Sequence, residues 1–67
     1  MIEEHDRVAL KADLPEHNLC SGDIGVIVLV HGDYNAYELE IFDSDGHTLD
    51  VITVDATQVY SIADHAT

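Results

Sequence analysis

Basic residues are almost absent from this sequence. Its 67 residues include only 2 lysines and arginines against 14 aspartates and glutamates, so the formal net charge at pH 7 is −12. Proteins that bind nucleic acid hold its phosphates with Lys and Arg, and an acidic surface repels those phosphates. The composition therefore argues against a nucleic-acid partner. It favours either a surface that steers toward a basic protein or a general adaptation to solubility or high salt, and both interpretations stay open.

Covalent and metal crosslinks are also missing. The one cysteine, Cys20, cannot form an internal disulfide, and the sequence holds no four-ligand zinc pattern. His17 and Cys20 could supply metal ligands, and His31 or Asp33 could complete the set. We favour Cys20 as a half-buried apolar filler beside Leu19 instead. We therefore predict no metal and no cofactor, and expect the apolar core alone to give a stability of about 3 to 10 kcal/mol.

Long hydrophobic runs are absent as well. The longest apolar stretch, residues 24–30, is far shorter than the roughly 20 residues that a membrane-spanning helix needs. The first residues, MIEEHD, lack the basic start and apolar segment of a secretion signal. We therefore expect a single cytoplasmic domain over residues 1–67 with no membrane contact, ordered over about 5–62 and followed by a loose tail at 63–67.

What the sequence does contain is a series of short β-type segments. In residues 37–41 the apolar side chains alternate with Glu38 and Glu40, which is the period-two pattern of a half-buried strand. Residues 24–31 are apolar on both faces, as expected if one long strand serves two sheets, with Gly25 at a bend or bulge. The pattern predicts strands over residues 6–11, 24–31, 37–41, 47–54 and 59–62.

The connections between these segments narrow the fold class. A long loop at 12–23 contains Pro15 and Gly22 as breakers, and DSDG at 43–46 suits a hairpin turn with Gly46 in the left-handed position. DSDG also resembles the start of a calcium loop, but the further ligands of an EF-hand are missing. We predict an all-β, five-stranded, strongly bent antiparallel barrel of the SH3-like type, with an OB-like barrel as the rival.

Several motifs carry a family resemblance. They are DLPEHNL at 13–19, SGDIGVIV at 21–28, AYELEIFDSDGHTLDVITV at 36–54 and the closing VYSI at 59–62. Together they resemble the bacterial domain-of-unknown-function family numbered 4926, over residues 6–62. The resemblance implies a small stand-alone SH3-like barrel with no assigned enzymatic role. These motifs are signatures of turns and strands, so they indicate a fold and not an activity.

Catalysis requires a nucleophile or an acid–base pair held in a concave pocket. Asp, Glu and His are plentiful here, but no spacing marks out such a pair, and a barrel this small fills its interior with side chains. We therefore predict no catalytic residues and no enzyme.

A binding role remains. SH3-like barrels often bind ligands between the long first loop and the turn after the second strand. Here those segments hold Leu14, Pro15, His17, Leu19, Tyr34 and Tyr37. Leu14, Leu19 and Tyr37 are better interpreted as core residues, which leaves the other three as surface candidates. We expect a monomer or weak homodimer that docks onto a basic protein partner, such as an operon-paired protein or the target of an inhibitor. The alternative is a structural accessory subunit of a larger enzyme.

Overall fold

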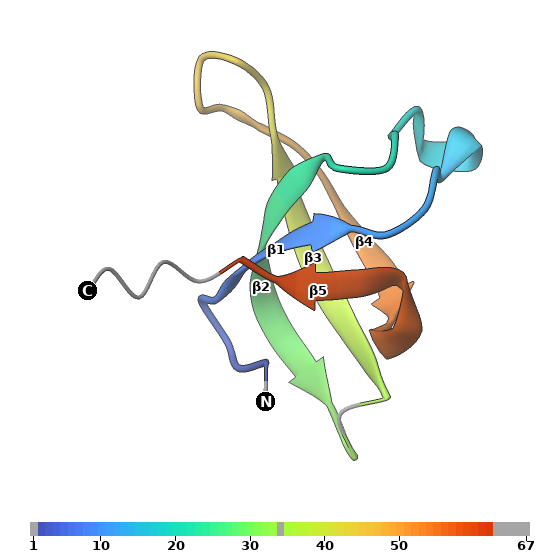
Figure 1. Cartoon of the computed structure of the whole chain (residues 1–67). Helices are drawn as coiled ribbons and strands as arrows, with labels where there is room; N and C mark the ends of the chain where they lie inside the picture. The colour runs from blue at the N-terminus through green and yellow to red at the C-terminus, as the bar shows by residue number, and fades with distance from the viewer. Residues whose placement is uncertain (1, 34, 63–67) are drawn as a thin grey trace.

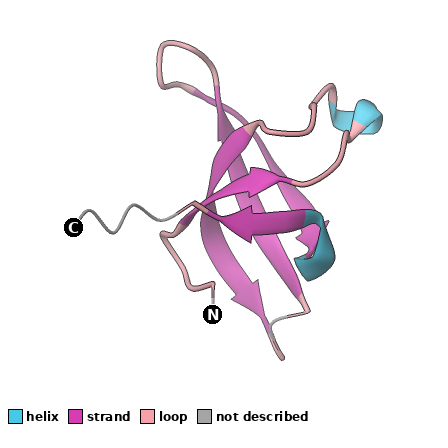
Figure 2. Cartoon of the chain, viewed as in Figure 1, coloured by secondary structure: helices cyan, strands magenta, loops and turns pink. Residues whose placement is uncertain are grey.

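The computed structural model describes residues 2–33 and 35–62 (Figures 1 and 2). The strands in chain order are β1 (Arg7–Leu10), β2 (Ile24–His31), β3 (Ala36–Phe42), β4 (Thr48–Asp55) and β5 (Val59–Ser61). Single 3-10 turns, η1 (Pro15–His17) and η2 (Ala56–Gln58), precede β2 and β5. None of the helical segments in this described part of the chain has the length and apolar character to cross a bilayer. Tyr34 and the predicted tail at 63–67 lie outside the described residues.

All five strands form one antiparallel sheet in the order β4-β3-β2-β1-β5. Figure 1 shows that the sheet is strongly bent, with β5 and β1 crossing in front of β2, β3 and β4. The predicted all-β antiparallel fold is therefore confirmed. Two details differ: the sheet is open at β4 and β5, so it is not a closed barrel, and β2 belongs to a single sheet and not to two.

The concave face of the sheet carries the core. Tyr37, Leu39 and Ile41 are all buried, which confirms the alternation predicted for β3. Among the described residues no buried side chain is polar or charged. The buried set is Val8, Ala9, Leu10, Leu14, Ile27, Tyr37, Leu39, Ile41, Ile52, Val54 and Val59.

Ala9 departs from the simple alternation of β1. The sequence pattern places it with Arg7 on the side opposite Val8, yet it is buried. Its cross-strand partners are Ile24 on β2 and Tyr60 on β5. Directly opposed side chains lie on the same face of a sheet, so two large apolar neighbours cover this small side chain from either side.

The irregularity of β2 lies farther along the strand than predicted. The register with β3 shifts between Ile27 and Leu29, which makes Val28 the extra residue of a bulge. Gly25 instead pairs regularly with Ile41. A bulge moves one residue out of the alternation, which explains why Val28 and Leu29 in succession are both exposed.

Candidate functional site

The long loop between β1 and β2 is closed on itself at its tip. The backbone N–H of Leu14 donates to the Leu19 carbonyl at 2.9 Å, and the N–H of Leu19 donates back to Leu14 at 3.1 Å. The η1 turn fills the space between them, and Asn18 ends it in the left-handed conformation at φ 63°. Leu14 is buried in the core and Leu19 is partly buried against it, in agreement with their interpretation as core residues.

Two aspartates hold the base of this loop. Asp13 Oδ1 accepts a hydrogen bond from the N–H of Ser21 at 2.8 Å, and Asp23 Oδ2 accepts one from the N–H of Cys20 at 2.9 Å. The N–H of Gly22 donates to the Leu10 carbonyl at 2.9 Å. Short polar side chains that bond to nearby backbone stabilise loop conformations of this kind. These hydrogen bonds hold the loop in one conformation, so it can form one wall of a groove.

The β3–β4 hairpin is the neighbouring structure at the same end of the sheet (Figure 1). Asp43 Oδ1 accepts from the N–H groups of both Asp45 and His47, and Gly46 has φ 85°, which confirms the predicted hairpin turn. Potential metal-ligand atoms of Asp43, Asp45 and His47 lie within 4.8 Å of one another. Because the bonds of Asp43 hold the turn itself, we assign this cluster to hairpin structure.

An apolar groove lies between the loop and the hairpin, and we call it the loop–hairpin groove. It consists of a smaller hollow of about 140 Å³ and a larger one of about 270 Å³. Asn18, Leu19, Ile41 and Leu49 line both hollows. The smaller hollow is completed by His17, Asp50 and Ile52, and the larger by Asp23, Ile24 and Phe42.

The walls of this groove contain three exposed apolar side chains. Leu49 is 63% exposed, Ile24 52% and Phe42 37%. Exposed apolar side chains that gather around one hollow, with polar residues at its rim, are typical of interaction sites. Asp23 and Asp50 supply that rim, one in each hollow. The groove can therefore receive apolar side chains and attract positive charge.

The predicted binding residues are divided by the structure. Leu14 and Tyr37 are buried, in agreement with their interpretation as core residues. Pro15 and His17 are exposed on η1, and His17 lines the smaller hollow. Tyr34 lies outside the described residues. The role of these residues in protein binding stays a prediction.

The predicted location of the binding groove needs correction. The first loop and the β2–β3 turn lie at opposite ends of β2 (Figure 1), so they do not share a groove. The loop instead faces the β3–β4 hairpin. Sequence reasoning missed Ile24, Phe42 and Leu49. For Ile24 and Leu49 the signal was the presence of apolar residues on both faces of β2 and β4, whereas Phe42 at the end of the alternating strand β3 gave no such signal.

The same separation affects the metal ligands considered above. His17 and Cys20 belong to the first loop, whereas His31 and Asp33 lie at the far end of β2. The structure therefore does not bring these four residues together. Cys20 is exposed, so its interpretation as a half-buried filler is wrong. Its backbone N–H donates to Asp23 Oδ2 at 2.9 Å, so this residue takes part in the loop through its main chain.

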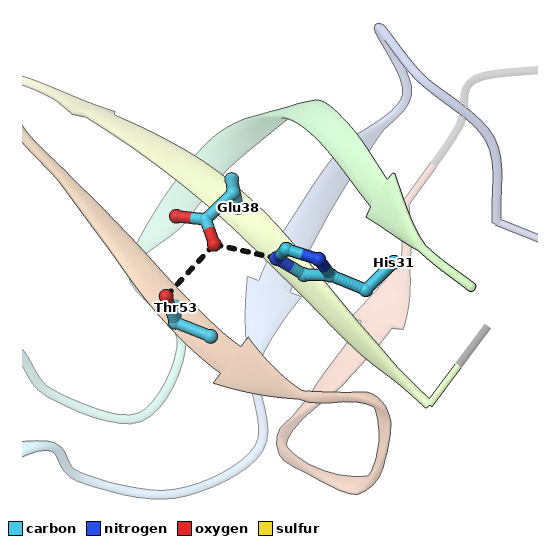
Figure 3. A network of polar contacts seen from close by, with 3 residues as sticks. All are labelled: His31, Glu38 and Thr53. Atoms are coloured by element: carbon cyan, nitrogen blue, oxygen red, sulfur yellow. Dashed lines mark hydrogen bonds and ion pairs between the residues drawn. The ribbon is translucent and has the colours of Figure 1, made fainter. Parts of the chain in front are cut away.

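A polar network lies on the outer face near the other end of the sheet (Figure 3). His31 Nε2 donates to Glu38 Oε2 at 2.6 Å, because an ionised carboxylate can only accept. Thr53 Oγ1 donates to the same oxygen at 2.8 Å. These bonds, first that from His31 and then that from Thr53, lower the pKa of Glu38 below its usual 4.5.

Glu38→Gln tests this network through its pH dependence. A carboxyl group with a lowered pKa in the folded state stabilises the fold above its unfolded pKa, and this contribution is lost as the pH falls through the folded pKa. At pH 7 we expect the variant to be less stable by about 0.2–1 kcal/mol, as is usual for an exposed pair. The difference in Tm from the wild type should shrink as the pH is lowered from about 7 to about 3.

Glu40→Gln is the matched control for the loss of one negative charge. Glu40 lies on the same strand and accepts a hydrogen bond from Thr48, without a histidine partner in the described part of the chain. The comparison matters because neutralising any carboxylate relieves repulsion in a chain of charge −12. A Glu38→Gln variant that matched Glu40→Gln at every pH would show that the His31 contact adds nothing.

Comparison with known proteins bears on the family of the chain and leaves its fold and activity open. No curated protein and no solved structure matches the chain. The family description carries no function, so the groove and its residues rest on the geometry above. The family model described as Domain of unknown function (DUF4926) matches residues 4–61, nearly the whole sequence, and the chain therefore belongs to this family.

Proposed function

We propose that this protein is a non-enzymatic interaction module of the cytoplasm that docks onto a basic partner protein. The observation that carries the proposal is the loop–hairpin groove, in which exposed Leu49 lines both hollows and exposed Ile24 and Phe42 line the larger one. Each hollow also has one aspartate in its lining. Burial of such apolar side chains is the main favourable term in protein association. The groove therefore offers a hollow in which apolar side chains of a partner can be buried.

The negative net charge of the chain favours some classes of partner over others. With 14 acidic residues against Arg7 and Lys11, the surface repels nucleic-acid backbones and the anionic headgroups of membranes. The same field accelerates encounter with a positively charged protein and suppresses encounter with other acidic chains. A basic protein is thus the partner that both the apolar groove and the charge favour.

Recovery of a partner from the native host tests the proposal. A tagged full-length chain should retain, near 1:1 stoichiometry, a protein of net positive charge, and the recovery should fall as ionic strength rises from about 50 to about 300 mM. The proposal would be contradicted if repeated experiments recovered no stoichiometric partner. It would also be contradicted if the partner were acidic and its retention did not depend on salt concentration. A partner enzyme that stays bound throughout purification and needs the chain for its own stability would identify the accessory-subunit role instead.

A further inference from the structure

The loop–hairpin groove has the dimensions of a site for two side chains. Its smaller hollow, of about 140 Å³, is close to the roughly 150 Å³ of an apolar cavity that binds benzene. The larger one, of about 270 Å³, accommodates an aromatic or long aliphatic side chain. Leu19 and Leu49 line both hollows, so the two bound side chains would lie next to each other across this shared wall.

Each hollow of the groove has one negatively charged side chain in its lining. Asp50 borders the smaller hollow and Asp23 the larger. Each carboxylate is fixed through one oxygen by a backbone N–H, from Val51 at 2.8 Å and from Cys20 at 2.9 Å respectively. The second oxygen of each remains available to a cationic side chain. A held carboxylate loses little conformational entropy when it binds, which favours Lys or Arg on either side of the apolar pair.

A second copy of this chain is a poor occupant. Each copy carries a net charge of −12, so two copies repel each other as they approach. Like charges brought together at an interface oppose association. Charge complementarity therefore assigns the groove to a different, basic chain.

Peptides also commonly bind by strand addition to the free edge of a sheet. At the free edge of β4, hydrogen bonds within the chain oppose this mode of binding. The N–H of Ala56 donates toward β3, to the carbonyl of Asn35 at 2.9 Å, so the N–H groups of Asp55 and Val51 point away from the sheet. Asp50 Oδ1 accepts from Val51, and Gln58 Oε1 accepts from Asp55 at 2.7 Å. An added strand would have to displace both bonds.

We propose that the groove binds one short segment of the partner with two apolar side chains flanked by Lys or Arg, and that it does so by side-chain insertion without strand pairing to β4. This inference rests on the proposed function and specifies its ligand. The two hollows take the apolar pair, and the two rim aspartates take the flanking cations.

Two exposed residues of β4 give a matched pair of variants. Leu49 lines the groove, whereas Val51 is 48% exposed and is paired with Glu40 on the outer face. In the full-length tagged chain, Leu49→Ser should lower recovery of the partner by at least about tenfold, since a hot-spot side chain contributes about 1.4 kcal/mol or more. Val51→Ser should leave recovery within about twofold. Circular dichroism of both variants checks that they fold.

Further variants locate the ligand and the binding mode. A photoreactive phenylalanine analogue at His17, beside the smaller hollow, should crosslink to a partner segment with two apolar residues and neighbouring Lys or Arg. A synthetic peptide of that segment should bind the wild-type chain at least about tenfold more tightly than Leu49→Ser. Gln58→Ala, which frees the N–H of Asp55 at the β4 edge, should leave this affinity unchanged.

The outcomes separate the two proposals. Equal recovery of a basic partner by wild type, Leu49→Ser and Val51→Ser would overturn the groove assignment and leave the interaction role standing. A crosslinked segment without apolar residues or without basic ones would overturn the stated ligand chemistry. Tighter peptide binding by Gln58→Ala would indicate strand addition. Absence of any partner for the wild-type chain would overturn both proposals.

Discussion

Ile27→Ala is expected to remove most of the stability of this domain. Ile27 lies at the centre of β2, is 0% exposed, and is paired with buried Leu39 on β3. Truncating such a side chain costs about 2–5 kcal/mol, because the apolar burial is lost and a cavity remains. A chain of this length has only about 3 to 10 kcal/mol in total. Urea unfolding followed by circular dichroism should show a midpoint shifted far toward zero denaturant.

Val28→Ala is the matched control for this prediction. Val28 is the next residue along β2 and is also β-branched, but it lies at the bulge and is 38% exposed. Its truncation should cost less than about 1 kcal/mol, as is usual for partly exposed positions. Equal losses for the two variants would mean that β-propensity and not core packing stabilises β2.

The strands were predictable because their signals are local. The bounds of β2, Ile24–His31, coincide with the predicted strand, and the inward set on β3 follows from strict alternation. The hairpin at Asp43 and the left-handed Asn18 follow from the backbone preferences of turn residues. Each of these features depends on the order of neighbouring residues, which the sequence displays directly.

Features that depend on strand pairing were not predictable in the same way. Ala9 is buried by residues on β2 and β5, and a pattern within β1 contains no information about them. The apolar character of both faces of β2 suggested two sheets, but the strand lies in one sheet and leaves Ile24, Val28 and Leu29 exposed. The exposure of Cys20 depends on the path of the whole loop, which a spacing of three from His17 does not reveal.

The candidate site illustrates the same limit. The sequence identified the first loop as a binding element, and His17 and Leu19 do line the groove. Sequence reasoning placed the β2–β3 turn opposite this loop. That placement is wrong, because the eight residues of β2 separate the loop from the turn. Leu49 and Phe42 resemble ordinary strand residues until the hairpin is placed beside the loop. A groove made by separate segments has no contiguous sequence motif.

Gly25→Ala is expected to have the second large effect on stability, about 1–3 kcal/mol, through overpacking. A Cβ atom at Gly25 would lie 2.7 Å from the carbonyl oxygen of Glu40 and 2.8 Å from Leu39 Cδ1. The side chain of Leu39 could rotate, but the Glu40 oxygen belongs to the backbone of the paired strand. The methyl group therefore has to push β2 and β3 apart at the centre of the sheet. Thermal unfolding should show the loss directly.

Substitutions at Gly22 provide a control that distinguishes the effect of backbone strain from the effect of lack of space. It has φ 93°, and nothing lies within 4 Å of the position that a Cβ atom would take, so Gly22→Ala should cost about 1–2 kcal/mol through conformation alone. Asn tolerates the left-handed region, so Gly22→Asn should recover much of that loss. Gly25 is not left-handed, so Gly25→Asn should be at least as destabilising as Gly25→Ala. If Asn were tolerated at position 25, the close approach of β2 to β3 would not be the reason that glycine is needed there.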